Sequence, residues 1–527
     1  MTRHKVLIAG EWRDSSGTQT FRAEDPVSML PLADEYPVSD WADCEAALQA
    51  ADDAARQLRQ VPVDVLARFL ELYAEKIDQT KELLVETAHI ETALPKSPRL
   101  ADVELPRTTH QLRQAAAAAH EGSWRMAVID TRNNIRSGYV ALGPVCVFGP
   151  NNFPFAFGSI SGGDFAAAIA AGNPVIAKAN TSHPGTTRLL AELAHSAARN
   201  THLPPGTIQL LYRTSHQDGE RLVSDRRTGA TGYTGSRSAG LKLKAAADAA
   251  GKPIYLELSS VNPVVILPGA LHERPEKIAE EFTTSCLMGS GQFCTNPGLV
   301  VLLAGAESES FIQSVARRFG QAPIGTLLSR GTRQQLEQSL AELQQAGARV
   351  VGETVCVGGR GYCSPNTLLQ VDGDRFLEQA EALQTEAFGN ASLVVLARDL
   401  DQACQVIDHL EGNLTGCVYS DTEGRDDTAY QRIAEHLRPR VGRLLNDKMP
   451  TGVTVSPAMN HGGPYPATGH PGFTAVGLPA AMVRFAMLQC YDQVRADRLP
   501  GWLQDKTPNG MMWRYVDGRW TQADAVR

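Results

Sequence analysis

The chain lacks the cysteine pattern of a disulfide-built or zinc-binding protein. Its nine cysteines are an odd number among 527 residues and are scattered without a repeated Cys-x-x-Cys unit. Neither a disulfide framework nor a structural metal site is therefore indicated, and we expect no metal. Unpaired cysteines are typical of a reducing compartment, so a cytoplasmic protein is expected.

Long apolar segments and long runs of one charge are also missing. The longest apolar region, residues 165–177, is interrupted by Asn173 and Pro174 and is too short to cross a bilayer. The apolar segment at the N-terminus is too short for a signal peptide. A net charge of -8, without a long Lys/Arg run, argues against nucleic acid or an anionic membrane as the main partner.

What the chain does have is enough length for two or more domains with large cores. Strand-like and helix-like segments alternate from about residue 174 to 258, which predicts parallel strands in an open, doubly wound α/β sheet. A second alternating set runs from about 268 to 457. The last 60 residues are rich in Gly, Pro and aromatic residues, including Trp502, Trp513 and Trp520, and this composition suits a docking or oligomerisation arm.

One cysteine, Cys294, lies in a short loop between Gly291 and Gly298, after a helix-like run that ends near Met288. Glycines allow the backbone to approach a ligand closely, and loop amides can stabilise a developing anion. The alternative is a buried small hydrophobe, which is the commonest role of a free cysteine. The same alternative, core packing, is what we expect for Cys286 on the preceding helix.

Four other segments have the character of site loops. Asn152 follows an apolar strand, where its amide could donate to an oxyanion or merely form a turn. Lys178 ends a buried strand, where it could hold cofactor hydroxyls or phosphate, or reach solvent. Residues 232–240 lead from a strand through Gly235 and Ser236 into a helix, whose free amides could bind phosphate. Glu257 ends another apolar strand and suits a general base if it is buried.

These segments together resemble the aldehyde dehydrogenase superfamily. The motifs occur in the family's order and at its spacings over about 240 residues, namely 148–154, Lys178, 234–236, 257–258, 291–294 and 386–389. Within the superfamily the chain is most similar to the NADP-linked α-ketoglutarate semialdehyde (2,5-dioxovalerate) dehydrogenase group. The similarity to that group rests on Ser259-Ser260, the Cys-Thr-Asn-Pro-Gly continuation from Cys294, and the stretches 183–186 and 461–468.

The resemblance implies a Rossmann-like cofactor domain over 1–267, an α/β catalytic domain over 268–457, and a small oligomerisation element. The last would combine an inserted segment, about 124–141, with an arm in 458–527, and would make a homodimer or homotetramer. Cys294 would attack the aldehyde and Asn152 would stabilise the oxyanion. Glu257 would activate the water that hydrolyses the thioester. Lys178, Gly235, Ser236, Glu386 and Phe388 would contact the cofactor.

Two departures from the family pattern matter for the cofactor and the site. Most NAD-using members have a glutamate where Thr181 stands, and that carboxylate would repel the 2′-phosphate of NADP. Arg213 is a candidate second cation for the phosphate beside Lys178, so NADP is the expected cofactor, with NAD possible. Asn390 replaces the usual proline after Gly389.

Three alternatives remain open from the sequence. A CoA-acylating relative would use Cys294 but generally lacks the glutamate at position 257. A medium- or long-chain fatty-aldehyde dehydrogenase is possible because four phenylalanines could line an apolar tunnel, namely Phe153, Phe155, Phe157 and Phe473. The third is a non-catalytic binding protein of the same fold, against which the joint presence of Cys294, Glu257 and Asn152 argues.

Overall fold

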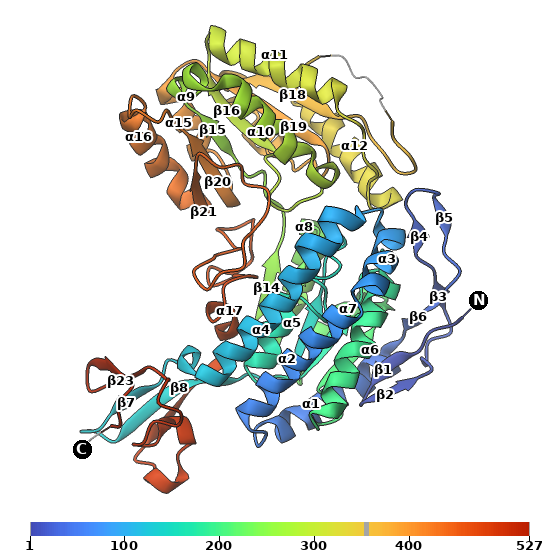
Figure 1. Ribbon diagram of the computed structural model, residues 1–527, viewed down its shortest axis with the longest axis vertical. Coiled ribbons are helices and arrows are strands. Elements are labelled where there is room, and N and C mark those ends of the chain that lie inside the picture. The colour runs from blue at the N-terminus through green and yellow to red at the C-terminus, as the bar shows by residue number, and fades with distance from the viewer. Residues whose placement is uncertain (1, 353–357, 526–527) are drawn as a thin grey trace.

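Two seven-stranded sheets and a projecting five-stranded sheet organise the molecule. The computed structural model describes residues 2–352 and 358–525. The first large sheet and its helices form the lower body in Figure 1, and the second forms the upper body. The small sheet extends from the lower body as an arm, with the C-terminus at its tip (Figure 1).

The first sheet has the strand order β14-β13-β9-β10-β11-β1-β2. The strands from β14 to β11 pair in parallel, whereas β1 and β2 add an antiparallel edge. The five parallel strands are short and almost wholly buried, as expected for strands covered on both faces. The bounds are β1 Val6–Ile8, β2 Glu11–Arg13, β9 Val145–Phe148, β10 Val175–Lys178, β11 Ile208–Leu211, β13 Ala230–Thr234 and β14 Ile254–Glu257.

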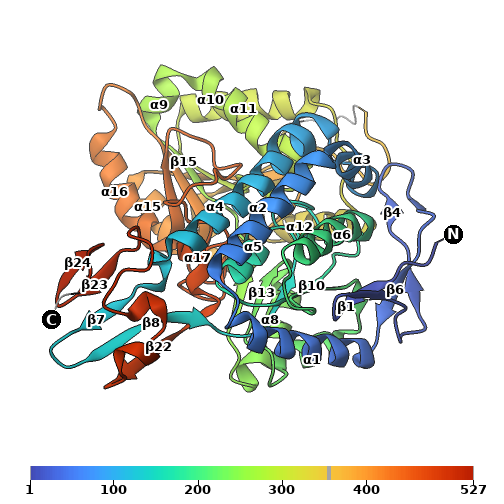
Figure 2. The same cartoon turned by 60° about the horizontal axis from the view of Figure 1, so that its bottom comes forward.

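Helices cover both faces of this sheet, as Figure 2 shows. One layer contains α1 (Trp41–Leu58), α7 (His216–Ser224) and α8 (Arg237–Ala249). The other contains α2 (Val63–Gln79), α4 (Leu105–Glu121), α5 (Gly163–Ala170) and α6 (Pro184–Asn200), and α3 (Lys81–Thr92) packs on α6. The start of α8 follows from its sequence, because the Ser236 hydroxyl caps it by accepting from the Ala239 amide.

The second sheet has the order β17-β18-β19-β16-β15-β20-β21 and is parallel except for β17. Separate apolar clusters cover its two faces. Its strands are β15 Val264–Ile266, β16 Leu299–Leu303, β17 Arg349–Val350, β18 Thr367–Asp372, β19 Ala391–Ala397, β20 Asn413–Tyr419 and β21 Val441–Asn446. Its main helices are α10 Pro275–Leu287, α11 Ala306–Gln321, α12 Arg330–Gln345, α15 Leu400–Asp408 and α16 Asp427–Leu437.

The arm joins two parts of the chain that are far apart in sequence. Strands β7 (Val128–Asp130) and β8 (Ile135–Ala141) pair with β22 (Ala486–Asp492), β23 (Arg514–Val516) and β24 (Arg519–Thr521) in the order β22-β8-β7-β23-β24. A small apolar cluster lies beneath them. The tryptophans Trp513 and Trp520 remain half exposed.

The structure confirms the α/β class and the alternation of strands and helices that the sequence predicts. Cys286 is buried in the core, as expected. The inserted segment expected over about 124–141 contributes β7 and β8 to the arm. Among the residues that the structure describes, no helix combines the length and apolarity needed to traverse a bilayer.

Candidate active site

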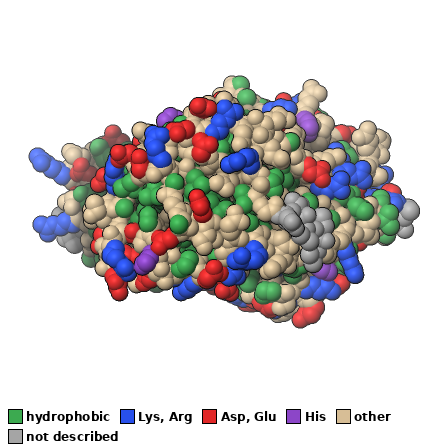
Figure 3. All heavy atoms as spheres, turned by 90° about the horizontal axis from the view of Figure 1, so that it is seen from above, with side chains coloured by type: hydrophobic (Ala, Val, Ile, Leu, Met, Phe, Trp, Pro, Cys, Tyr) green, Lys and Arg blue, Asp and Glu red, His purple; other side chains and the backbone are tan. Residues whose placement is uncertain are grey.

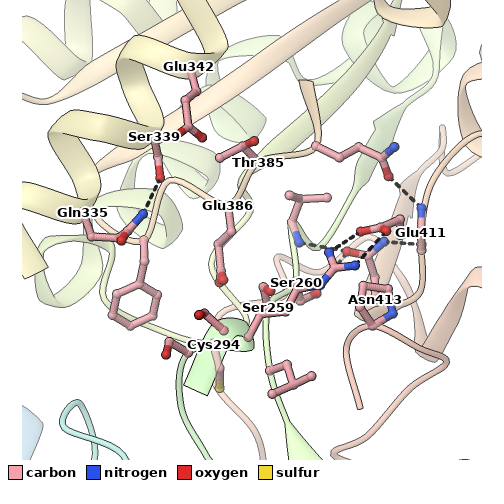
Figure 4. Close-up of a pocket in the computed structure, with 18 of the residues that line it drawn as sticks. Ser259, Ser260, Cys294, Gln335, Ser339, Glu342, Thr385, Glu386, Glu411 and Asn413 are labelled. Carbon is pink, nitrogen blue, oxygen red and sulfur yellow. Dashed lines mark hydrogen bonds and ion pairs between the residues drawn. The ribbon is translucent and has the colours of Figure 1, made fainter. Parts of the chain in front are cut away.

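The site lies where the carboxyl ends of the first sheet's strands face the second body. A cavity of about 1290 Å³ is lined by residues of both bodies. Figure 4 shows Cys294 at the floor of this cavity, with Glu386 and the Ser259–Ser260 turn beside it. Asn152, Gly235, Ser236, Glu257 and Phe388 also line it. This position, at the carboxyl edge of a parallel sheet, is the usual ligand crevice of open α/β folds.

The loop that carries Cys294 is held from both sides. It begins after α10 and a short 3₁₀ turn, Met288–Gly291. Gly291 has φ +69°, and a Cβ at this position would lie 1.9 Å from the Gly389 carbonyl oxygen, so only glycine fits. On the other side, the Asn262 amide donates to the Cys294 carbonyl at 2.9 Å. Contacts to the backbone of the loop on both sides of Cys294 therefore fix its geometry.

A histidine brings Cys294 and Glu257 together. The His461 Nε2 atom lies 3.4 Å from the Cys294 Sγ and 3.0 Å from the Glu257 Oε1. His461 and Glu257 are each 1% exposed. The second carboxylate oxygen of Glu257, Oε2, is buried and has no hydrogen-bond partner among the described residues. The arrangement offers a thiol, a proton acceptor and a free carboxylate oxygen in one enclosed place.

The charge balance around the thiol opposes its ionisation. Burial raises the pKa of the Cys294 thiol well above its usual value, and the Glu257 carboxylate raises this pKa further. The Arg107 guanidinium acts in the opposite direction and lowers it. A thiol in this state needs a neighbouring base to become a nucleophile, and His461 is the group in contact with it.

The same three side chains could also present ligands to a metal ion. One ligand atom from each of Glu257, Cys294 and His461 lies within 4.8 Å of the others. A soft divalent ion such as Zn²⁺ is bound by thiolate, imidazole and carboxylate together. An ion held there would occupy the thiol and the histidine at once, so it would compete with any chemistry at Cys294.

Asn152 lies in the cavity and is anchored by its surroundings. One N–H of its amide donates to the Gln292 carbonyl at 3.0 Å, and its backbone carbonyl accepts from Arg99 at 2.9 Å. The second N–H of the amide is not used in these contacts, so it is available to an oxygen atom on substrate. The loop after Asn152 is held by Glu104, which accepts from the amides of Phe155 and Ala156.

The expected cofactor residues fall into two groups. Gly235, Ser236, Glu386 and Phe388 line the cavity, and burial raises the pKa of Glu386 to about 8. Lys178, Thr181 and Arg213 are not among the lining residues of the cavity. Lys178 is the last residue of β10, and Thr181 follows it by three residues. Lys178 is partly buried, and its pKa is lowered to about 8 by burial and by the Arg213 charge. Arg213 is exposed on the short strand β12 (Arg213–Thr214).

The residues fit a dinucleotide. The free amides at the start of α8 and the small residues Gly235 and Ser236 leave room for a pyrophosphate against the helix. Lys178 has no acidic partner among the described residues, and its charge interacts with that of Arg213. Two cations without a carboxylate between them favour a phosphate group.

Sequence reasoning missed two residues of the site, His461 and Arg107. His461 belongs to the stretch 461–468 that the sequence analysis noted for its similarity only. A buried histidine has no signature at the sequence level, because its partners lie 167 and 204 residues away. Arg107 lies on α4, a helix whose pattern predicts only packing.

The replacement of proline by Asn390 proves to be structural. Its amide donates to the Ser364 carbonyl at 2.8 Å and to the Asn366 side chain at 2.7 Å. Proline has no side-chain donor for these contacts. Asn390 therefore ties the loop of Glu386 to the segment before β18.

The expected apolar tunnel is not purely apolar. The four phenylalanines are buried, but the Arg99 guanidinium lies 4.2 Å from the Phe153 ring centre and that of Arg107 lies 4.8 Å from the Phe157 ring centre. Phe473 contacts Arg484 instead. Guanidinium groups along this wall argue against a channel for a fatty chain.

An α/β fold with a cysteine at the strand ends, between a dinucleotide crevice and a buried carboxylate, defines an oxidoreductase that acts on aldehydes. The chain belongs to the aldehyde dehydrogenase family, whose model matches residues 12–463. This family uses NAD or NADP. It typically acts on small aldehydes.

Two relatives are similar over nearly their whole length. The chain is 40% identical to alpha-ketoglutaric semialdehyde dehydrogenase 2 of Azospirillum brasilense, over 95% of this chain and 97% of the relative. It is 34% identical to alpha-ketoglutaric semialdehyde dehydrogenase of Acinetobacter baylyi, over 98% and 99%. Neither relative's name favours the fatty-aldehyde alternative.

Solved structures show the same fold at lower identity. One is 3,6-anhydro-L-galactose dehydrogenase in complex with NAP, with a TM-score of 0.80 at 20% identity, covering 93% of this chain and 99% of that one. Another is 1-pyrroline-5-carboxylate dehydrogenase from Thermus with bound NAD, with a TM-score of 0.80 at 22% identity, covering 93% and 92%.

Proposed function

We propose that this enzyme oxidises α-ketoglutarate semialdehyde to α-ketoglutarate and prefers NADP to NAD. The contact of the Cys294 thiol with His461, which in turn contacts Glu257, carries the assignment of the reaction. The choice of aldehyde is supported by the two relatives that bear this substrate in their names.

In the first step the Cys294 sulfur attacks the aldehyde carbon. The thiol proton passes to the His461–Glu257 pair as the carbon–sulfur bond forms. The carbonyl oxygen becomes an oxyanion, which the Asn152 amide and the Cys294 backbone N–H stabilise. The His461 Nε2 atom contacts the Cys294 thiol and the Glu257 carboxylate, so the proton can pass from the sulfur to Nε2 and on to Glu257.

In the second half of the reaction the chain must release an acid from the sulfur. A nicotinamide held at Glu386 would supply hydride acceptance, and Cys294 would then hold the acyl group as a thioester. Glu257 then takes a proton from a water molecule at its free Oε2 atom. The resulting hydroxyl attacks the thioester, the carbon–sulfur bond breaks, and the thiolate regains its proton.

Cofactor preference rests on charge. Thr181 is neutral where a carboxylate would repel the 2′-phosphate, and Lys178 and Arg213 supply positive charge nearby. We propose that the adenosine ribose of NADP lies beside these three residues, with the pyrophosphate at Ser236 and the nicotinamide ribose at Glu386.

We also propose that the enzyme is a homo-oligomer assembled through the arm. Strands β22 and β24 are the edges of the arm sheet. Edge strands with exposed large apolar side chains are prone to association. Such side chains on the arm are Met487, Leu488, Trp513 and Trp520.

The eight described cysteines are free, which fits a reducing, cytoplasmic location.

A screen of purified enzyme tests the proposed function. α-Ketoglutarate semialdehyde, succinate semialdehyde, pentanal and a long-chain aldehyde are each offered with NADP and with NAD. The highest kcat/KM is expected for α-ketoglutarate semialdehyde with NADP. Cys294→Ala should abolish turnover and retain cofactor binding, and a long-chain aldehyde as the best substrate would refute the assignment.

A further inference from the structure

Arg107 is a half-buried cation that forms no hydrogen bond or ion pair with the described residues. Its Nε and Nη2 atoms are buried and have no hydrogen-bond partner among the described residues. Burial lowers the pKa of its guanidinium to about 10, which leaves it charged at neutral pH. A buried charge without a counter-ion is costly, so such groups are rare unless something binds them.

Its neighbour Arg99 is paired through both of its terminal nitrogen atoms, although its Nε atom has no partner among the described residues. Arg99 forms a buried ion pair with Glu104 and donates to the Asn152 carbonyl. Glu104 is fully used by Arg99 and by the backbone amides of Phe155 and Ala156. No carboxylate on this side of the site is therefore left for Arg107.

The Arg107 guanidinium interacts electrostatically with Cys294, although it is not among the residues that line the cavity of about 1290 Å³. It packs 4.8 Å from the ring centre of Phe157, and that ring lies 5.4 Å from the ring of His461. Its charge acts on the thiol and on Glu257, which are the reacting groups. The Glu257 carboxylate acts on this charge from a distance, but no hydrogen bond or ion pair joins the two side chains among the described residues.

A second arginine near the thiol is already occupied. Arg443 on β21 donates to the carbonyls of Pro450 and Gly452, at 3.1 and 3.3 Å. Its charge also acts on Cys294. Its position is thus set by backbone contacts although its Nε atom has no partner, whereas no hydrogen bond to the described residues fixes Arg107.

We propose that Arg107 binds the carboxylate of the substrate and makes the enzyme selective for short aldehydes that carry an acid group at the far end. The inference rests on the proposed function and names the residue that enforces it. A guanidinium presents a planar fork of N–H groups that matches a carboxylate. The rings of Phe153 and Phe157 pack against the flat side of the Arg107 guanidinium, so the N–H groups at its edge are left for the ligand.

The experiment compares charged and uncharged substrates in Arg107→Met, Arg107→Lys and the unmodified enzyme. The kcat/KM for α-ketoglutarate semialdehyde should fall about 100-fold in Arg107→Met, since a charged hydrogen-bonded contact is lost. The kcat/KM for pentanal, which has the same chain length but no carboxylate, should fall much less, because only the effect of the Arg107 charge on the pKa of Cys294 is lost. Arg107→Lys keeps the charge and should recover part of the loss.

Inhibition supplies a readout that does not depend on turnover of the charged aldehyde. Glutarate, a five-carbon dicarboxylate, should compete with pentanal in the unmodified enzyme and should lose this effect in Arg107→Met. Arg113→Gln is the matched control, because Arg113 lies on the same helix but pairs with Asp78 at the surface. It should behave as the unmodified enzyme in every assay.

The outcomes separate this inference from the proposed function. If unmodified enzyme oxidises pentanal but not α-ketoglutarate semialdehyde, the proposed substrate is wrong. If it oxidises α-ketoglutarate semialdehyde and Arg107→Met does so equally well, only the role of Arg107 is wrong. An equal loss for both substrates in Arg107→Met would mean that the residue supports the fold of the site, and would also overturn the inference.

Discussion

One nitrogen atom of His461 contacts both the Cys294 thiol and the Glu257 carboxylate in the buried site. Because its Nε2 contacts the thiol and the carboxylate, protons released at Cys294 need not reach solvent. Burial and the Glu257 charge hold the pKa of Cys294 high, so the unassisted thiol is a poor nucleophile near neutral pH. The residue-scale predictions test these roles.

Replacement of His461 by Phe should make activity depend on pH. Without the imidazole, thiolate forms only as pH rises toward the elevated pKa of Cys294, so kcat/KM should be low at pH 7 and should increase steeply with pH. The unmodified enzyme should show a flatter profile. Measurement of kcat/KM from pH 6 to 10 decides this, and parallel profiles would show that His461 does not take part in proton transfer.

Replacement of Glu257 by Gln should slow release of the acid. Loss of the carboxylate oxygen that accepts a proton from water leaves the thioester on Cys294. One equivalent of reduced cofactor should form rapidly, followed by very slow turnover, and mass spectrometry should detect the acyl-enzyme. Absence of the rapid phase would place Glu257 in thiol activation instead.

Selectivity for NADP should decline above about pH 8. The pKa of Lys178 is lowered to about 8, so the free enzyme carries this charge below that pH and loses it above. The ratio of kcat/KM for NADP to that for NAD cancels the effect of pH on the thiol and should fall as pH rises from 7 to 9. Thr181→Glu should reverse the preference at pH 7. A constant ratio would exclude Lys178 from phosphate binding.

At the scale of elements, the site depends on loops that lock to one another across the cavity. The Gly291 backbone lies against Gly389, in the loop that carries Glu386, and Asn296 also donates to the Gly389 carbonyl at 3.3 Å.

Acidic and basic side chains are mixed on the face over the second body in Figure 3.

Replacement of Gly291 by Ala should disturb both loops at once. The added methyl group would meet the Gly389 oxygen and would require a strained positive φ. We expect kcat to fall by at least about 100-fold with a modest loss in Tm, since displacement of reacting groups by about 1 Å costs this much. Gly305→Ala is the control, because a Cβ there meets nothing within 4 Å. Full activity in Gly291→Ala would contradict this reading.

At the scale of the whole molecule, the arm projects outward from the lower body (Figure 1). Its two edge strands expose apolar side chains that the single chain leaves in water. Association of copies through these edges would bury them, and the catalytic cavity lies elsewhere.

Replacement of Leu488 by Glu and of Trp520 by Glu should reduce the mass in solution. Charges on edge strands oppose pairing between chains. Light scattering coupled to size exclusion should show an oligomer for the unmodified enzyme and a smaller species for the double variant. Circular dichroism checks that the fold is retained. A monomeric unmodified enzyme would refute the proposed assembly.

The sequence by itself determined the α/β class, the two sets of alternating elements and the motif that contains Cys294, because these features depend on local patterns and spacing. It also predicted that Glu257, Asn152 and Glu386 share a site, and they do line one cavity. Only the tertiary structure decided what surrounds the thiol. His461 and Arg107 reach it from segments 167 and 187 residues away, and the unpaired state of Arg107 is a property of the packed site, where Arg99 has taken the nearby carboxylate.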